Sequence, residues 1–167
     1  MEIVRAKASD ADALTWIALA AKGYWGYPEE WIEQWREDLT VSAGFIRRNE
    51  VYVAVFGEKA VAFYALVEED HAPVLEHLWV SPEWIGSGVG RALFGHAVRK
   101  AASLGATVME IEAEPNAEGF YLRMGARRAG ERVSEIDGQE RVLPLMVVSV
   151  PGEALMVAGS SEERSER

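Results

Sequence analysis

The chain has 167 residues, 49% of them apolar, which suits a single domain with a substantial core. Its 27 aspartates and glutamates outnumber its 17 lysines and arginines, and the net charge of −10 excludes the basic footprint of a nucleic-acid-binding protein. The lack of cysteine excludes disulfide bonds, thiolate metal sites and a cysteine nucleophile. No apolar run reaches about 18 residues and the first ten residues do not resemble a signal peptide, so we expect a cytoplasmic protein that does not bind a membrane.

The first forty residues predict one strand and two helices. We expect a strand over residues 1–6, a helix ending near residue 22, and a second helix over about 28–39. Apolar residues recur on one face of the first helix, and a serine or aspartate between residues 9 and 12 is suited to cap it. Pro28 and the two glutamates after it are favourable in the first turn of the second helix.

The middle of the chain predicts three strands and a long helix. The strands are expected over residues 51–56, 60–67 and 74–80, with a hairpin turn between the first two. Residues 89–104 form the clearest helix, because their apolar residues make one continuous stripe. Gly105 stands where the cap of that helix is expected.

The remaining residues complete a mixed fold. We expect a strand over 107–113, a short helix over about 117–124, and two strands over 128–133 and 143–150. Residues 1–150 are then one domain, and residues 151–167 are expected to be a disordered tail. Because only one strand–helix–strand crossover is convincing, we predict an α/β (α+β) fold with a mixed, mostly antiparallel central sheet and helices on both faces.

The segment Gly86-Ser87-Gly88-Val89-Gly90-Arg91 lies between a strand and the clearest helix. The first amides of a helix have no internal partners, and glycines let an anion approach them. The segment therefore predicts a phosphate-binding loop, although a turn that only lets the helix begin is an alternative. A P-loop is excluded because no Gly-Lys-Ser or Gly-Lys-Thr occurs. A dinucleotide loop fits less well, because position 91 is arginine and five residues separate the strand from the first glycine.

The segment LEHLWVSPEWIGSGVGRALFGHAVRKAASLGA, followed by EAEPNAEGFYLRMGA, resembles two motifs of the GCN5-related N-acetyltransferase (GNAT) superfamily. The order of the expected elements over residues 1–150 also agrees with that family. The resemblance implies an N-acetyltransferase (acyltransferase) that transfers an acetyl group from acetyl-CoA to a primary amine by direct attack. It implies no covalent enzyme intermediate and no metal.

The resemblance also implies the contacts to coenzyme A. Loop amides hold the pyrophosphate, the pantetheine arm runs along the preceding strand, and the Val80 amide donates to the thioester oxygen. The residues concerned are Leu78, Trp79, Val80, Ile85, Gly86, Ser87, Gly88, Val89, Gly90, Arg91, Asn116 and Tyr121. Ile85 departs from the Gln or Arg that the family usually has there, and Asn116 could instead be a plain helix cap.

Tyr121 is the expected general acid, because a phenol is protonated at neutral pH and can donate to a leaving thiolate. Packing of a short helix is its alternative role. Glu76 is the expected base, with Glu112 in reserve, and a solvated strand residue is the alternative for Glu76. His77 should point to the opposite face of its strand from Glu76.

The acceptor is expected to be a small-molecule or peptide amine. Four of the six tryptophans fall between residues 16 and 35, where the family's first helices wall the acceptor site. Core packing explains most of them, but we expect Tyr24, Trp25 and Tyr27, together with Glu76 and Glu112, to bind the substrate. The family implies that a homodimer is one expected state. A non-catalytic acyl-CoA-binding or sensor module and a nucleotide-binding module are the alternative functions.

Overall fold

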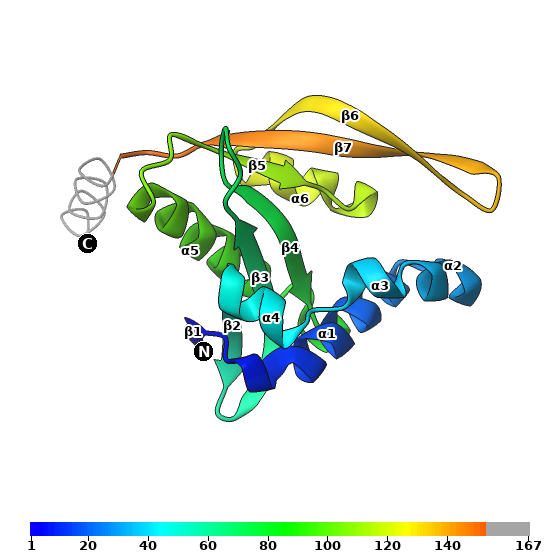
Figure 1. The fold of residues 1–167 in the computed structure, drawn as a ribbon, viewed down its shortest axis with the longest axis horizontal. Helices are drawn as coiled ribbons and strands as arrows, with labels where there is room; N and C mark the ends of the chain where they lie inside the picture. Colours follow the sequence, from blue (N-terminus) through cyan, green and yellow to red (C-terminus); the bar gives the residue numbers. More distant parts are fainter. Residues whose placement is uncertain (153–167) are drawn as a thin grey trace.

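The computed structural model describes residues 1–152 (Figure 1). The strands are β1 (Glu2–Arg5), β2 (Glu50–Phe56), β3 (Lys59–Val67), β4 (Val74–Val80), β5 (Val108–Glu112), β6 (Arg127–Ile136) and β7 (Gln139–Ser149). The helices are α1 (Ala11–Tyr24), α2 (Glu29–Gln34), α3 (Arg36–Leu39), α4 (Ala43–Arg48), α5 (Val89–Ser103) and α6 (Glu118–Arg123). Short 3-10 helices cover Ala8–Asp10, Pro82–Trp84 and Pro115–Ala117. The expected tail, from residue 153 on, lies outside the described residues.

The strands form one sheet in the order β1-β2-β3-β4-β5-β7-β6. Neighbouring strands are antiparallel except β4 and β5, which are parallel and are connected by α5. The predicted mixed, mostly antiparallel sheet with helices on both faces is therefore confirmed. No helix within residues 1–152 has the length and apolar character needed to cross a membrane.

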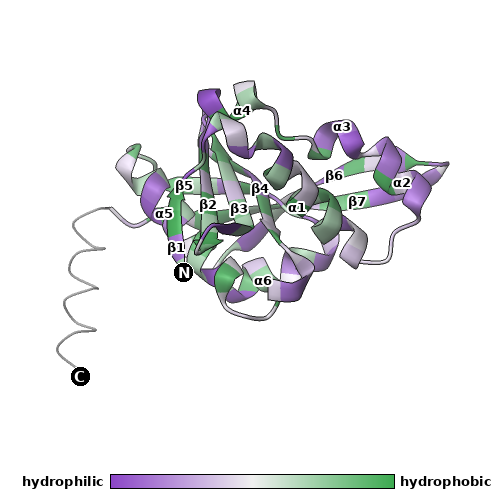
Figure 2. Ribbon diagram, turned by 90° about the horizontal axis from the view of Figure 1, so that it is seen from below, coloured by the Kyte–Doolittle hydropathy of each residue, from purple (hydrophilic) through white to green (hydrophobic). Residues whose placement is uncertain are grey.

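Each face of the sheet carries its own core (Figure 2). On one face Leu93 and Ala97 of α5 pack with the buried Tyr64 of β3. On the other face Leu14 of α1 packs with Phe63, the neighbour of Tyr64. Side chains along a strand alternate between the two faces of the sheet. A central strand that is buried on both faces therefore has a continuous apolar sequence, as β3 does.

The N-terminal helices differ from the prediction in three ways. The helix expected over residues 28–39 divides at Trp35, which is a turn residue (φ −87°, ψ −2°) between α2 and α3. Helix α4 was not predicted, although its capping signal is present, since the Ser42 hydroxyl accepts a hydrogen bond from the Phe45 amide at 3.0 Å. Asp10 does not cap α1, because its carboxylate instead accepts from the Lys7 amide at 2.7 Å.

The β6–β7 hairpin is longer than the two strands predicted from the sequence. Its turn consists of Asp137 and Gly138, both with positive φ (49° and 77°), as a two-residue hairpin loop requires. Only residues 145–149 of β7 pair with β5, so the rest of the hairpin projects past the sheet toward α2 (Figure 1). There Gln34 of α2 donates to Asp137 at 2.9 Å. The hairpin and α2 thus form opposite walls beside the sheet.

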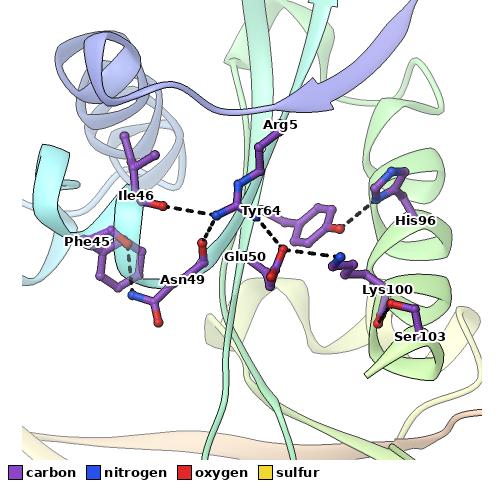
Figure 3. A network of polar contacts seen from close by, with 9 residues as sticks. All are labelled: Arg5, Phe45, Ile46, Asn49, Glu50, Tyr64, His96, Lys100 and Ser103. Atoms are coloured by element: carbon purple, nitrogen blue, oxygen red, sulfur yellow. Dashed lines mark hydrogen bonds and ion pairs between the residues drawn. The ribbon is translucent and has the colours of Figure 1, made fainter. Parts of the chain in front are cut away.

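A polar network ties β1, β2 and α5 together (Figure 3). The Arg5 guanidinium contacts Glu50 at 2.6 Å, and Lys100 of α5 reaches the same carboxylate at 3.6 Å. Beside it, the buried Tyr64 hydroxyl hydrogen-bonds Nδ1 of His96 at 2.7 Å. His96 therefore helps to anchor α5 on the sheet.

Candidate active site

Strand β4 separates from β5 after its own first two residues. They pair only where Val74 and Leu75 lie beside β5. Against β3, β4 contains a bulge, because Leu75 and His77 pair with consecutive residues of β3 and leave Glu76 as the extra residue. A bulge bends a strand and redirects its side chains. The two strands therefore open a gap, and Glu76 faces it.

Two cavities meet at this gap. The first, here called the loop cavity, has a volume of about 450 Å³ and lies between β4, the glycine loop and α6. The second, the hairpin cavity, has about 380 Å³ and lies between α1–α3 and the β6–β7 hairpin. Both are lined by Glu76, Trp79, Glu112 and Glu114. These four residues therefore form the common boundary of the two cavities.

The glycine loop has the backbone geometry of an anion site. Gly86 and Gly88 have φ values of 81° and 89°, which glycine adopts without strain, and a Cβ atom at either position would meet open space. The first amide of α5 that donates to a backbone carbonyl within residues 1–152 is that of Ala92, which bonds the Gly88 carbonyl at 3.1 Å. The amides before it in that turn are free to bind an anion.

Two amides of the loop segment are engaged within the protein. The Ile85 amide donates to Pro82 and the Ser87 amide to Trp84, both at 3.3 Å. All the residues expected to contact coenzyme A line the loop cavity except Ser87 and Val89. The Val89 side chain is instead buried in the core under α5.

The edge of β4 beside the gap is unpaired after Leu75. The Ser81 amide donates to Val61 of β3 at 2.8 Å, and pairing alternates along antiparallel strands. The amides and carbonyls of Val80 and Leu78 therefore point away from β3, into the loop cavity. Such an edge can accept an extended molecule as an added strand.

Tyr121 of α6 is buried against Phe94 and Phe120, with ring centroids 5.9 and 5.2 Å away, and it lines the loop cavity. Its hydroxyl makes no hydrogen bond to any residue among 1–152. Burial, followed by the charge of Glu114, raises the pKa of Tyr121 above its usual range. The hydroxyl is therefore a proton donor at neutral pH.

Glu76 and His77 have different environments. Partial burial, then the charges of Glu112 and Glu69, raises the pKa of Glu76 above its usual value. His77 accepts a hydrogen bond on Nδ1 from the Trp79 indole at 3.0 Å, and burial lowers its pKa to about 4. His77 is thus a neutral packing residue, whereas Glu76 lines both cavities at the gap.

A buried ionic cluster closes the gap on the α1 side, and the sequence did not suggest it. Glu114 lies 3.6 Å from Lys22 Nζ and 3.9 Å from Arg141. The Tyr27 hydroxyl donates to the Glu114 carboxylate and accepts from Arg141 at 2.9 Å and from Asn116 at 3.0 Å. Lys22 lies one turn after Ala18 on the buried face of α1. A lysine on the apolar face of a helix is the one sequence feature that could have indicated a buried ion pair.

Of the five residues expected to bind the substrate, Trp25, Glu76 and Glu112 share the loop cavity, whereas Tyr24 and Tyr27 do not line it. Glu76 and Glu112 line both cavities, whereas Trp25 lines the loop cavity. Tyr24 is exposed, packs edge-on against Trp25 at 5.2 Å and lines neither cavity. Tyr27 is held in the ionic cluster.

Asn116 joins the same cluster as Tyr27. Its backbone amide donates to the Glu114 carboxylate at 2.6 Å. Its side-chain amide donates to the Tyr27 hydroxyl and, at 3.2 Å, to the Glu114 carboxylate. Asn116 therefore does not cap α6, whose N-cap residue is Ala117.

The sequence matches known acetyltransferases. Residues 47–125 match the family model described as an acetyltransferase (GNAT) domain. The peptidyl-lysine N-acetyltransferase YjaB of Escherichia coli is 31% identical over 116 residues, which cover 70% of this chain and 73% of that protein. The protein of the same name from Salmonella typhimurium is 29% identical over 107 residues, which cover 64% and 69%.

Solved structures share the fold. A GCN5-related N-acetyltransferase from Rhodopseudomonas palustris has a TM-score of 0.75 at 21% identity and covers 89% of this chain and 94% of its own. PaiA N-acetyltransferase from Thermoplasma acidophilum, solved in complex with coenzyme A, has a TM-score of 0.70 at 21% identity and covers 89% and 98%. The family model and the identity to the E. coli relative together show that the chain belongs to the GNAT family and is an acetyltransferase, an enzyme that takes its acetyl group from acetyl-CoA.

Proposed function

We propose that the enzyme transfers the acetyl group to a primary amine by direct attack, with acetyl-CoA in the loop cavity and the amine in the hairpin cavity. The observation that supports this most is the meeting of the two cavities at Glu76, Trp79, Glu112 and Glu114. An amine and a thioester held in separate cavities react only where those cavities join. Holding both reactants there converts a bimolecular reaction into an effectively unimolecular one.

The backbone is proposed to hold the donor. The free amides at the start of α5, with Arg91 beside them, would bind the pyrophosphate. The unpaired edge of β4 would bind the pantetheine arm, and the Val80 amide would donate to the thioester oxygen as negative charge develops on it.

Two side chains are proposed to move protons. Glu76, directly or through a water molecule, removes a proton from the ammonium group so that the neutral amine can attack. The new C–N bond forms as the C–S bond breaks, and the Tyr121 hydroxyl gives its proton to the coenzyme A thiolate. The positively charged nitrogen of the adduct then loses its second proton, which restores the Tyr121 hydroxyl. No protein nucleophile is needed, in accord with a chain that lacks cysteine.

The acceptor is proposed to be an amine of a small molecule or a peptide. The E. coli and Salmonella relatives are named peptidyl-lysine N-acetyltransferases, so a lysine side chain is one candidate. A cytoplasmic location and a homodimer stay predictions.

The test is thiol release from acetyl-CoA in the presence of an amine panel that includes lysine peptides, with binding of acetyl-CoA measured by calorimetry. We expect micromolar binding and amine-dependent release of coenzyme A. Failure to bind acetyl-CoA would contradict the proposal. Binding without turnover on any amine would instead favour the non-catalytic sensor.

A further inference from the structure

The hairpin cavity has two cationic side chains on its buried side. Lys22 of α1 and Arg141 of β7 line this cavity, and their side chains are only 10% and 12% exposed. The exposed carboxylates that line the same cavity, such as Asp38 and Glu135, lie nearer to solvent. The cavity is therefore cationic at its inner end and acidic at its mouth.

The two cations are not neutralised by their neighbours. Glu114 is the carboxylate between them, and it already accepts hydrogen bonds from Tyr27 and Asn116. Among the three buried charged side chains of this cavity, two cations and one carboxylate leave an excess of one positive charge. A buried charge is costly unless it is paired, so this excess favours an incoming anion.

The hydrogen-bond donors of the two cations are also largely unused. Within residues 1–152, the polar partner of Lys22 Nζ is the Glu114 carboxylate, at 3.6 Å. Of the Arg141 nitrogens, one Nη donates to Tyr27, and the others make no hydrogen bond to described residues. Because neither side chain has a fully buried unpartnered nitrogen, the remaining donors reach the cavity.

Aromatic rings hold both cations in place. Lys22 Nζ lies 4.5 Å from the Trp35 ring centroid and 5.0 Å from that of Tyr27. The Arg141 guanidinium lies 4.6 Å and 4.9 Å from the same two rings. The two cations therefore share one aromatic wall and are positioned before any ligand binds.

We propose that Lys22 and Arg141 form a subsite for a carboxylate of the acceptor, so that the substrate carries both a primary amine and a carboxylate, as a free amino acid does. This inference rests on the proposed function, because it assigns the hairpin cavity to the acceptor. The single excess charge matches a carboxylate better than a dianionic phosphate. With the carboxylate at the inner end, the amine lies toward Glu76 and Glu112, where the two cavities join.

The experiment compares twenty L-amino acids with their C-terminal amides, which keep the amine and remove the negative charge. For the best amino acid we expect kcat/KM to fall about tenfold or more in the amide, since a charge-assisted contact is lost. Arg141→Gln should raise KM for the acid by a similar factor and leave KM for the amide unchanged. Arg128→Gln is the control, because Arg128 lies on the same hairpin, pairs with Glu118 and lines neither cavity.

A binding measurement separates the subsite from catalysis and from folding. The N-acetyl derivative of the same amino acid, which is the reaction product, should bind the wild-type protein in calorimetry about tenfold more tightly than it binds Arg141→Gln. Acetyl-CoA should bind both proteins equally, which shows that the variant is folded. Equal activity on acids and amides, or activity on lysine peptides alone, would overturn the subsite while leaving the acetyltransferase in place. Loss of acetyl-CoA binding in the wild type would instead reject the proposed function.

Discussion

Lys22→Met should remove a rise in the free energy of unfolding that occurs above pH 8 and that we assign to Lys22. Burial, against the opposing charge of Glu114, lowers the pKa of Lys22 from 10.5 to about 8 in the folded protein. Below pH 8 the lysine is charged in both states, so its full desolvation cost opposes folding. Between pH 8 and 10.5 the unfolded chain keeps a proton that the folded protein has released. The free energy of unfolding therefore rises with pH in this window.

The size of the effect follows from the same values. Each pH unit over which one proton separates the two states changes the free energy of unfolding by about 1.4 kcal/mol. With pKa values of 10.5 and about 8, Lys22 contributes a gain of roughly 2 kcal/mol between pH 7 and 9.5. The buried tyrosines do not produce this gain, because their raised pKa values act with the opposite sign and only above about pH 10.

The assay is urea unfolding followed by far-UV circular dichroism at pH 7, 8, 9 and 9.5. We expect the difference between wild type and Lys22→Met to change by roughly 2 kcal/mol over this range, in favour of wild type at high pH. Lys59→Met, at an exposed lysine paired with Glu83, should follow the wild-type curve. Parallel curves for wild type and Lys22→Met would refute the reasoning, because Lys22 would then titrate alike in both states.

Three further changes test the site. Tyr121→Phe should lower kcat at least about 100-fold and change acetyl-CoA binding less than about twofold, as measured by thiol release and calorimetry. Glu76→Gln should lower kcat and abolish the acid limb of the pH–rate profile without lowering Tm at pH 7, because folding disfavours the charged form of Glu76. Gly88→Ala should cost about 1–2 kcal/mol in urea unfolding and weaken acetyl-CoA binding, because its φ is 89° and it adds a methyl group to a residue that lines the loop cavity.

Each of these has a matched control or a contrary outcome. A Tyr121→Phe enzyme with the wild-type kcat would assign Tyr121 to packing. A lower Tm in Glu76→Gln would show that the carboxylate has a structural partner. Gly105→Ala carries the same backbone strain (φ 83°) at the far end of α5, so equal loss of acetyl-CoA binding in both glycine variants would indicate a general effect of strain.

The local parts of the site could be predicted from the sequence, and the long-range parts could not. The glycines of residues 86–90 and the alternation in residues 107–113 are contiguous patterns, and they predicted the loop before α5 and the strand β5. The ionic cluster depends on contacts across 87 residues between Tyr27 and Glu114 and across 114 residues between Tyr27 and Arg141. No spacing rule relates such positions, because the sheet topology alone brings them together. Tyr24, Trp25 and Tyr27 were expected at one pocket because they are close together in the sequence. The fold instead places Trp25 at the loop cavity and Tyr27 in the ionic cluster.

The bulge at Glu76 shows that a long-range feature can still leave a local signal. Leu75 is buried in the core under α5, and Leu78 packs against that same core. Residues three apart in a regular strand face opposite sides of the sheet, so both can reach one core only if the strand contains an extra residue between them. That extra residue is Glu76, and it separates β4 from β5 at the point where the two cavities meet. Odd spacing of core residues in an apolar strand therefore indicates both where the sheet opens and which side chain faces the opening.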